Sequence, residues 1–73
     1  NMNNAEISEF KKFVRQTLMK KYRMSEFEAQ RAVCDSYLSL ALKRDKGYVE
    51  HDSVEEWADF VYEEYRNEKL LQM

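Results

Sequence analysis

Residues that favour tight turns are scarce in the interior of this chain, which contains one glycine and no proline in 73 residues. A β-sheet needs a turn between successive strands, and such turns draw on Gly, Pro, Asn and Asp. Their scarcity predicts few connections and therefore helices. Aromatic residues, in which disordered chains are poor, make up 14% of the sequence. The chain is therefore expected to fold, and to fold as helices.

Apolar residues recur at spacings of three and four in three segments, which is the pattern of an amphipathic helix. These segments cover residues 4–22, 26–43 and 54–69. Short connections between successive helices favour antiparallel neighbours. The sequence therefore predicts an all-α fold, a three-helix bundle with up-down-up topology.

Capping residues mark where the predicted helices begin. Ser25 with Glu28, and Ser53 with Glu56, have the spacing of a capping box. In that motif the serine hydroxyl accepts a hydrogen bond from the amide three residues later, and the glutamate side chain accepts one from the amide of the serine. One of the two asparagines that precede the first segment can cap it in the same way.

The second predicted helix carries apolar residues over a wide arc of its surface. Such a helix contacts two neighbours, so we expect it to be the central one. Cys34 lies on its apolar side, where a cysteine packs as a small hydrophobic residue. Residues 44–52 form the only long connection, in which Gly47 is expected to supply a flexible or left-handed position.

The length of the chain provides for one domain with one core, expected to cover residues 2–73. Asn1 precedes a methionine, which indicates that Met2 is the natural start and Asn1 an added residue. No run of about 18 apolar residues is present, so neither a membrane-spanning helix nor a membrane partner is expected. Cys34 is the only cysteine, which favours a reducing compartment and predicts a cytoplasmic protein.

Charge is distributed unevenly along the chain. Residues 2–24 carry a net charge of +4, residues 25–50 of −1 and residues 51–73 of −5. Like charges four residues apart on the third predicted helix repel one another, so something nearby is expected to offset them. Three interpretations follow: the basic first helix faces the acidic third helix within one chain, one of them docks a partner or a second copy, or both charged faces are simply solvated.

Six basic residues in or next to the first predicted helix form a candidate basic patch. They are Lys11, Lys12, Arg15, Lys20, Lys21 and Arg23. Because phosphate contacts dominate affinity for nucleic acid, a nucleic-acid-associated regulator is the alternative function. Two observations disfavour it: the whole chain has a net charge of −2, and the third helix, the usual reader in a three-helix DNA-binding domain, is acidic.

Aromatic side chains on the third predicted helix provide a candidate partner-binding surface. The apolar stripe of that helix and the segment after it supply Trp57, Val61, Tyr62, Tyr65, Leu70 and Leu71. Trp and Tyr are preferred anchors of protein interfaces, and so small a chain is only marginally stable alone. The sequence predicts a non-enzymatic protein-interaction or regulatory module. Its partner is a protein or a second copy, and self-association through the third helix would give a homodimer.

The sequence offers no convincing catalytic or metal-binding constellation. His51 is the only histidine, so a metal site built on several histidines is excluded within one chain. Glu50 and Asp52 flank His51, but adjacent residues rarely converge on one ion. Cys34 has no evident base that would activate its thiol. The chain is therefore predicted to have no enzymatic activity, cofactor or metal.

Overall fold

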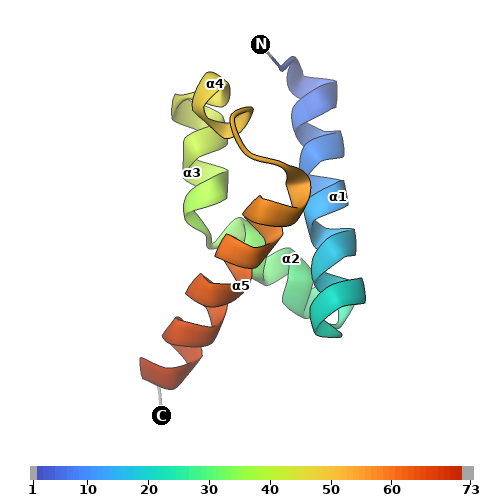
Figure 1. Ribbon diagram of the computed structural model, residues 1–73, viewed down its shortest axis with the longest axis vertical. Helices are drawn as coiled ribbons and strands as arrows, with labels where there is room; N and C mark the ends of the chain where they lie inside the picture. Colours follow the sequence, from blue (N-terminus) through green and yellow to red (C-terminus); the bar gives the residue numbers. More distant parts are fainter. Residues whose placement is uncertain (1, 72–73) are drawn as a thin grey trace.

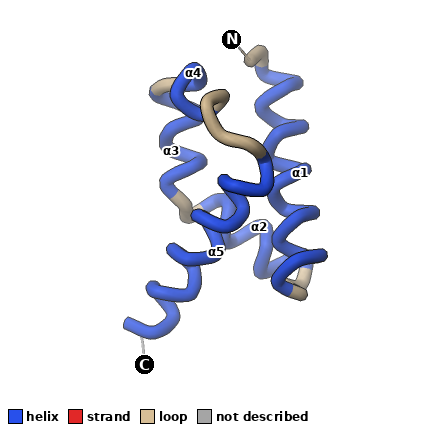
Figure 2. Tube along the Cα trace, viewed as in Figure 1, coloured by secondary structure: helices blue, strands red, loops and turns tan. Residues whose placement is uncertain are grey.

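A computed structural model describes residues 2–71, which contain helices and no strand (Figures 1 and 2). The range does not include Asn1, Gln72 and Met73. The predictions that Asn1 is an added residue and that the domain extends over residues 72 and 73 therefore lie outside the described residues. The helices are α1 (Asn4–Tyr22), α2 (Glu26–Cys34), α3 (Tyr37–Arg44), α4 (Lys46–Val49) and α5 (Val54–Leu71). The all-α fold class is confirmed. The up-down-up bundle of three helices is not, because the described chain has five.

The helices form an elongated body that measures 39 × 22 × 17 Å. In Figure 1, α1 descends along one side, α3 and α4 stand on the other, and α2 connects them below. Helix α5 crosses this group and continues to the far end of the long axis. Helices α2, α3 and α5 each contact three other helices, so the segment predicted as the second helix shares its central position with α5. Within residues 2–71, no helix combines the length and apolar character that crossing a bilayer requires.

The starts of the long helices follow the predicted caps. Asn3 caps α1 and forms a capping box with Glu6. At α2, the Ser25 hydroxyl accepts a hydrogen bond from the Glu28 amide, and the Glu28 carboxylate accepts one from the Ser25 amide, both at 3.1 Å. The same reciprocal bonds precede α5. Helix α1 ends at Arg23, whose φ of 56° places it in the left-handed region, and the chain can therefore turn tightly into α2.

The predicted helix over residues 26–43 is interrupted at Asp35 and Ser36, which is a correction to the sequence analysis. The hydroxyls of Ser36 and Ser39 both donate to the carbonyl oxygen of Val33, at 2.7 and 2.6 Å. Serine and aspartate side chains offer such local bonds in competition with the helical ladder. Apolar periodicity continues across the break, and for that reason the sequence suggested one helix.

A carboxylate from α5 stabilises the new helix start. The backbone amide of Tyr37, the first residue of α3, donates to the Glu64 carboxylate, with both oxygens at 3.2 Å. The negative charge also lies favourably at the positive end of the helix dipole. The break has a second consequence, because Cys34 now ends α2 and is exposed. The prediction that Cys34 packs in the core is therefore wrong.

The long connection contains the short helix α4, which the sequence analysis did not predict. The Asp45 side chain accepts a hydrogen bond from the Tyr48 amide at 3.1 Å and so caps the start of this helix. Gly47 lies inside α4 and does not adopt a positive φ, so its predicted left-handed role is wrong. Helix α4 places Val49 in the core with no exposed surface.

The core draws on all five helices. Its largest fully buried side chains are Leu18, Leu38, Val14, Val49 and Val61. Trp57 is 4% exposed, and its indole N–H donates to the carbonyl oxygen of Val49 at 2.9 Å. This bond ties α4 to α5 and satisfies the only polar atom of the ring, as buried tryptophans generally require.

The basic end of α1 packs against the acidic start of α5. The Lys21 ammonium lies 2.9 Å from a Glu55 oxygen and 3.0 Å from an Asp59 oxygen. The Tyr22 hydroxyl donates to Asp59 at 2.6 Å, and the Tyr22 ring stacks on that of Tyr62 with centroids 3.7 Å apart. A cation of the basic first helix therefore pairs with carboxylates of the acidic last helix within one chain. The two carboxylates hold the pKa of Lys21 above its ordinary value.

Candidate functional site

Four large apolar side chains with exposed surface gather on α3, α4 and α5. Tyr37 and Leu40 come from α3, Tyr48 from α4 and Phe60 from α5, and between 41% and 48% of each residue is exposed. We refer to these four residues as the aromatic face. Contiguous apolar surface of this kind marks interaction sites more often than isolated exposed side chains do.

Edge-to-face ring contacts join the aromatic face to the core. The rings of Tyr37 and Phe60 lie 6.3 Å apart at 77°, and Phe60 meets Trp57 at 5.7 Å and 88°. Trp57 in turn meets Tyr48 at 6.2 Å and 75°. These are favourable arrangements for aromatic pairs. Two of the exposed rings are therefore held by a buried one, and the third, Tyr37, is held by Phe60. These contacts reduce the entropy that the rings would lose on binding.

Helical spacing and the break before α3 explain why these side chains meet. Phe60 follows Trp57 by three residues, so it flanks the buried stripe of α5. Leu40 follows Tyr37 by three residues in the same way. Because the chain breaks at Ser36, Tyr37 occupies the first turn of α3, where its ring reaches Phe60. The sequence analysis did not select this set, and its only available signal was the spacing between Phe60 and Trp57.

Opposite charges flank the two sides of the aromatic face. On α3, Lys43 and Arg44 follow Leu40 by three and four residues, and both are exposed. On α5, Glu63 follows Phe60 by three residues and is also exposed. Residues three or four apart are neighbours on a helix surface. The α3 side of the face is therefore basic, and the α5 side is acidic.

The partner-binding residues selected from the sequence have separate locations. Trp57 and Val61 are buried. Tyr62 is half-buried under Tyr22, and the Tyr65 hydroxyl donates to Glu28 at 3.0 Å. Two further residues, Leu70 and Leu71, are 57% and 87% exposed at the end of α5. Two of the six predicted residues are thus buried, two are half-buried and two are exposed.

The candidate basic patch is spread around α1. Lys11 and Lys20 are nine residues apart, or two and a half helical turns, so they occupy opposite sides of the helix. Lys21 is engaged with carboxylates of α5, and Arg23 forms the left-handed end of α1. The others, Lys12 and Arg15, are exposed and half-buried respectively. The structure does not gather the six cations on one surface.

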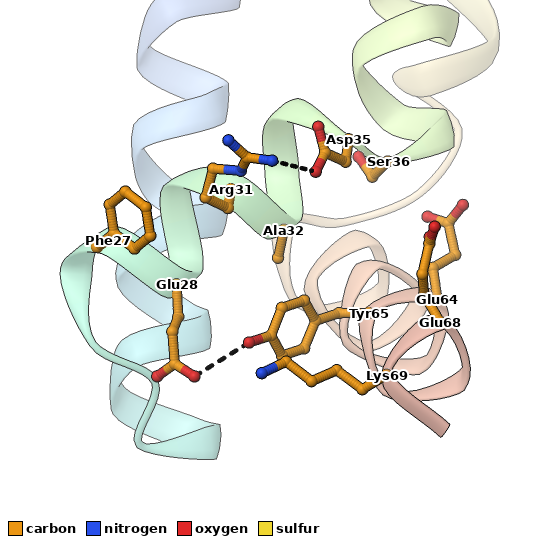
Figure 3. A pocket seen from close by; sticks show the side chains of 10 residues that line it. All are labelled: Phe27, Glu28, Arg31, Ala32, Asp35, Ser36, Glu64, Tyr65, Glu68 and Lys69. Carbon is orange, nitrogen blue, oxygen red and sulfur yellow. Dashed lines mark hydrogen bonds and ion pairs between the residues drawn. The ribbon is translucent and has the colours of Figure 1, made fainter. Parts of the chain in front are cut away.

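A groove of about 470 Å³ separates α2 from the second half of α5 (Figure 3). Its lining is mixed, with Phe27 72% exposed at one edge and charged side chains on both walls. The bond from Tyr65 to Glu28 spans the groove, and an ion pair of 3.4 Å joins Arg31 to Asp35. Much of its polar surface is therefore paired across or along its walls.

The groove carboxylates differ in their electrostatic environment. Hydrogen bonds from the Ser25 amide and the Tyr65 hydroxyl lower the pKa of Glu28. Burial raises the pKa of Glu64, against the opposing effect of the Tyr37 amide. The ammonium of Lys69 lies 5.4 Å from the Tyr65 ring centre, as in a cation–π contact. The bond between Tyr65 and Glu28 joins α5 to α2, and the bond between Glu64 and the Tyr37 amide joins α5 to α3. These groups therefore have a structural role.

The residues that could support catalysis are dispersed. Cys34 and His51 are both exposed, at the end of α2 and in the turn before α5. Within residues 2–71, no three His, Cys, Asp or Glu side chains are grouped so that they could hold a metal ion. Comparison of the chain with protein-family models, with curated proteins and with solved structures finds no match.

Proposed function

We propose that this protein is a non-enzymatic protein-interaction module that binds its partner through the aromatic face. The observation that carries the proposal is the set of four half-exposed apolar side chains, of which Phe60 and Tyr48 contact the Trp57 ring and Tyr37 contacts the Phe60 ring. Aromatic residues are enriched at interfaces, because they offer a large contact area at a low cost in conformational entropy. The rigid attachment of these rings to the core supports binding by a preformed surface.

This proposal has the same class of function as the sequence-based prediction, but it assigns binding to a different set of residues. Trp57 now acts as the buried support of the surface, and Phe60 and Tyr37 take the contact role that was expected of Val61 and Tyr62. A cytoplasmic location is part of the proposal. The exposed thiol of Cys34 supports it, because a free exposed cysteine persists most readily in a reducing compartment.

Binding of nucleic acid receives less support. A nucleic-acid surface usually presents a stripe of cations on one face. Here Lys11 and Lys20 lie on opposite sides of α1, and Lys21 is neutralised by Glu55 and Asp59. One nucleic-acid backbone could therefore contact only some of the six cations of the candidate basic patch.

Site-specific photo-crosslinking tests the proposal. A benzoylphenylalanine in place of Phe60 should form adducts with a protein when the full chain is irradiated in the cells that produce it. The matched control places the same group at Phe13, an α1 aromatic that is 42% exposed, close to the 45% of Phe60. Adducts at position 60 that are absent at position 13 would support the proposal. Equal adducts at both positions, or none at position 60, would refute it.

A further inference from the structure

The arrangement of charge around the aromatic face points to its partner. We infer that the partner is a second copy of this chain, docked face to face about a two-fold axis, with Arg44 of each copy opposite Glu63 of the other. This inference rests on the proposed function, since it names the occupant of the same surface. Three features of the face support it: its division into a basic and an acidic side, the availability of the cations, and the effect of two-fold symmetry.

The division of charge follows the two helices that form the face. The exposed cations Lys43 and Arg44 lie next to Leu40 on α3, and the exposed carboxylate of Glu63 lies next to Phe60 on α5. The contact between Tyr37 and Phe60 places the two helices side by side. A partner that covers the whole face must therefore present acidic groups to α3 and basic groups to α5.

A second copy has this complementary pattern by construction. In a two-fold dimer each surface patch meets its own counterpart, so contacts occur in reciprocal pairs. Rotation by half a turn about an axis that lies in the interface and runs between the α3 side and the α5 side brings the basic side of one copy over the acidic side of the other. An axis across that boundary would bring like charges together, so the charges also select the orientation of the dimer. Two contacts between unlike charges then form, and the exposed rings of both copies lie between them.

The charged groups are available for such contacts. Within residues 2–71, neither Lys43 nor Arg44 has a carboxylate within ion-pair distance. Glu63 lies 3.6 Å from Arg66 on the same helix, and both side chains are more than half exposed. Exposed pairs of this kind contribute little to stability. Glu63 can therefore exchange Arg66 for a cation of the second copy at little cost.

The size of the chain indicates how tightly such a dimer would bind. A standard interface buries about 800 Å² on each partner, which is about 15% of the 5321 Å² surface of this chain. Four half-exposed side chains with a charged rim make a compact centre, so we expect an interface at the low end of the specific size range and a weak dimer.

Charge reversal tests the inference by sedimentation velocity from low to high micromolar concentration. Wild-type protein should dimerise, and Arg44→Glu or Glu63→Arg alone should weaken dimerisation about tenfold or more, because each reversal acts twice in a symmetric dimer. An equimolar mixture of the two variants should recover the dimer, since the reversed charges then face each other. Lys20→Glu and Glu9→Arg, exposed reversals on α1, should dimerise as the wild type does, and circular dichroism should show all variants folded.

The outcomes separate the inference from the proposed function. Wild-type protein that stays monomeric throughout would overturn the inference, and so would variants whose mixture dimerises no better than each variant alone. If the wild type is monomeric while position 60 still crosslinks a different protein, the aromatic face remains a docking surface for another partner. If position 60 crosslinks nothing and the chain dimerises independently of Arg44 and Glu63, both proposals fail.

Discussion

Trp57 supports both the core and the aromatic face, so removing its ring should damage stability far more than removing the exposed ring beside it. Trp57→Ala deletes a side chain that is 4% exposed together with its hydrogen bond to Val49. Deletions of this kind cost about 3–5 kcal/mol. A domain of this length has a total free energy of unfolding of about 4–11 kcal/mol. The variant should therefore lose at least about a quarter of its stability, and at the low end of that range it would be unfolded at room temperature.

Phe60→Ala provides the matched comparison, because Phe60 touches the same indole and is 45% exposed. Fully burying a phenylalanine contributes about 1.5–3 kcal/mol, and about half of that applies to a side chain that is half exposed. We expect a loss of about 0.8–1.5 kcal/mol, or roughly 3–12 °C in Tm at about 4–8 °C per kcal/mol for a domain of this size.

Trp57→Phe separates the hydrogen bond from the ring. It removes the indole N–H donor, whose bond contributes about 0.5–1.5 kcal/mol, and reduces the volume of the ring. The Val49 carbonyl still accepts from the Asp52 amide at 3.3 Å, so it is not left without a partner. The loss should therefore fall between those of Phe60→Ala and Trp57→Ala.

Urea unfolding followed by far-ultraviolet circular dichroism measures all three variants, since tryptophan fluorescence disappears with the only tryptophan. All should be measured at one low protein concentration, where self-association does not contribute. A Trp57→Ala variant no less stable than Phe60→Ala would refute the account of Trp57 as the buried support of the face.

Three further changes test local parts of the structure. Ser25→Ala should cost about 0.5–2 kcal/mol in urea unfolding because α2 loses its cap, and an unchanged midpoint would contradict that role. The Tyr22 hydroxyl holds the pKa of Asp59 below its usual 3.8, so the stabilisation is complete above that pH and is lost as pH falls through the folded-state pKa. Asp59→Asn should flatten the acid limb of stability against pH, and an unaltered limb would contradict the linkage. Glu64→Ala should accelerate hydrogen exchange at the Tyr37 amide, whereas Glu64→Gln, which keeps an acceptor, should not; equal rates would exclude the cap.

The sequence was sufficient for features that depend on a few neighbouring residues. The capping boxes at Ser25 and Ser53 and the start of α5 at Val54 are confirmed, because a cap is formed by side chains within one turn of the amides it binds. The bounds of α1 at Asn4 and Tyr22 are also confirmed, and its start has the capping box of Asn3 and Glu6. Helical periodicity also identified the all-α class.

The break at Asp35 and Ser36 was missed because it depends on distant parts of the chain. Its local signal, two polar residues, is also compatible with a helix interior. The bonds from Ser36 and Ser39 to Val33 are local, but the helix start after the break is stabilised by a carboxylate from α5, since Glu64 caps the Tyr37 amide. The exposure of Cys34 follows from the same break. The spacing of apolar residues does not predict a contact between residues so far apart in the sequence.

The candidate site was missed for a related reason. Periodicity identifies the buried stripe of a helix, and it placed Trp57 and Val61 on that stripe correctly. It does not say how far the neighbouring helices cover the flanks. Phe60 remains half exposed because α3 reaches it only through Tyr37, and this arrangement depends on the break.

The central claim is that the aromatic face, and no other surface, is where the chain meets its partner copy. A dilution series of two-dimensional ¹H–¹⁵N NMR spectra of the full chain tests it residue by residue. We predict concentration-dependent shifts at Tyr37, Leu40, Tyr48 and Phe60, with none at Phe13. Shifts centred on Phe13, or a spectrum that does not change with concentration, would contradict the claim.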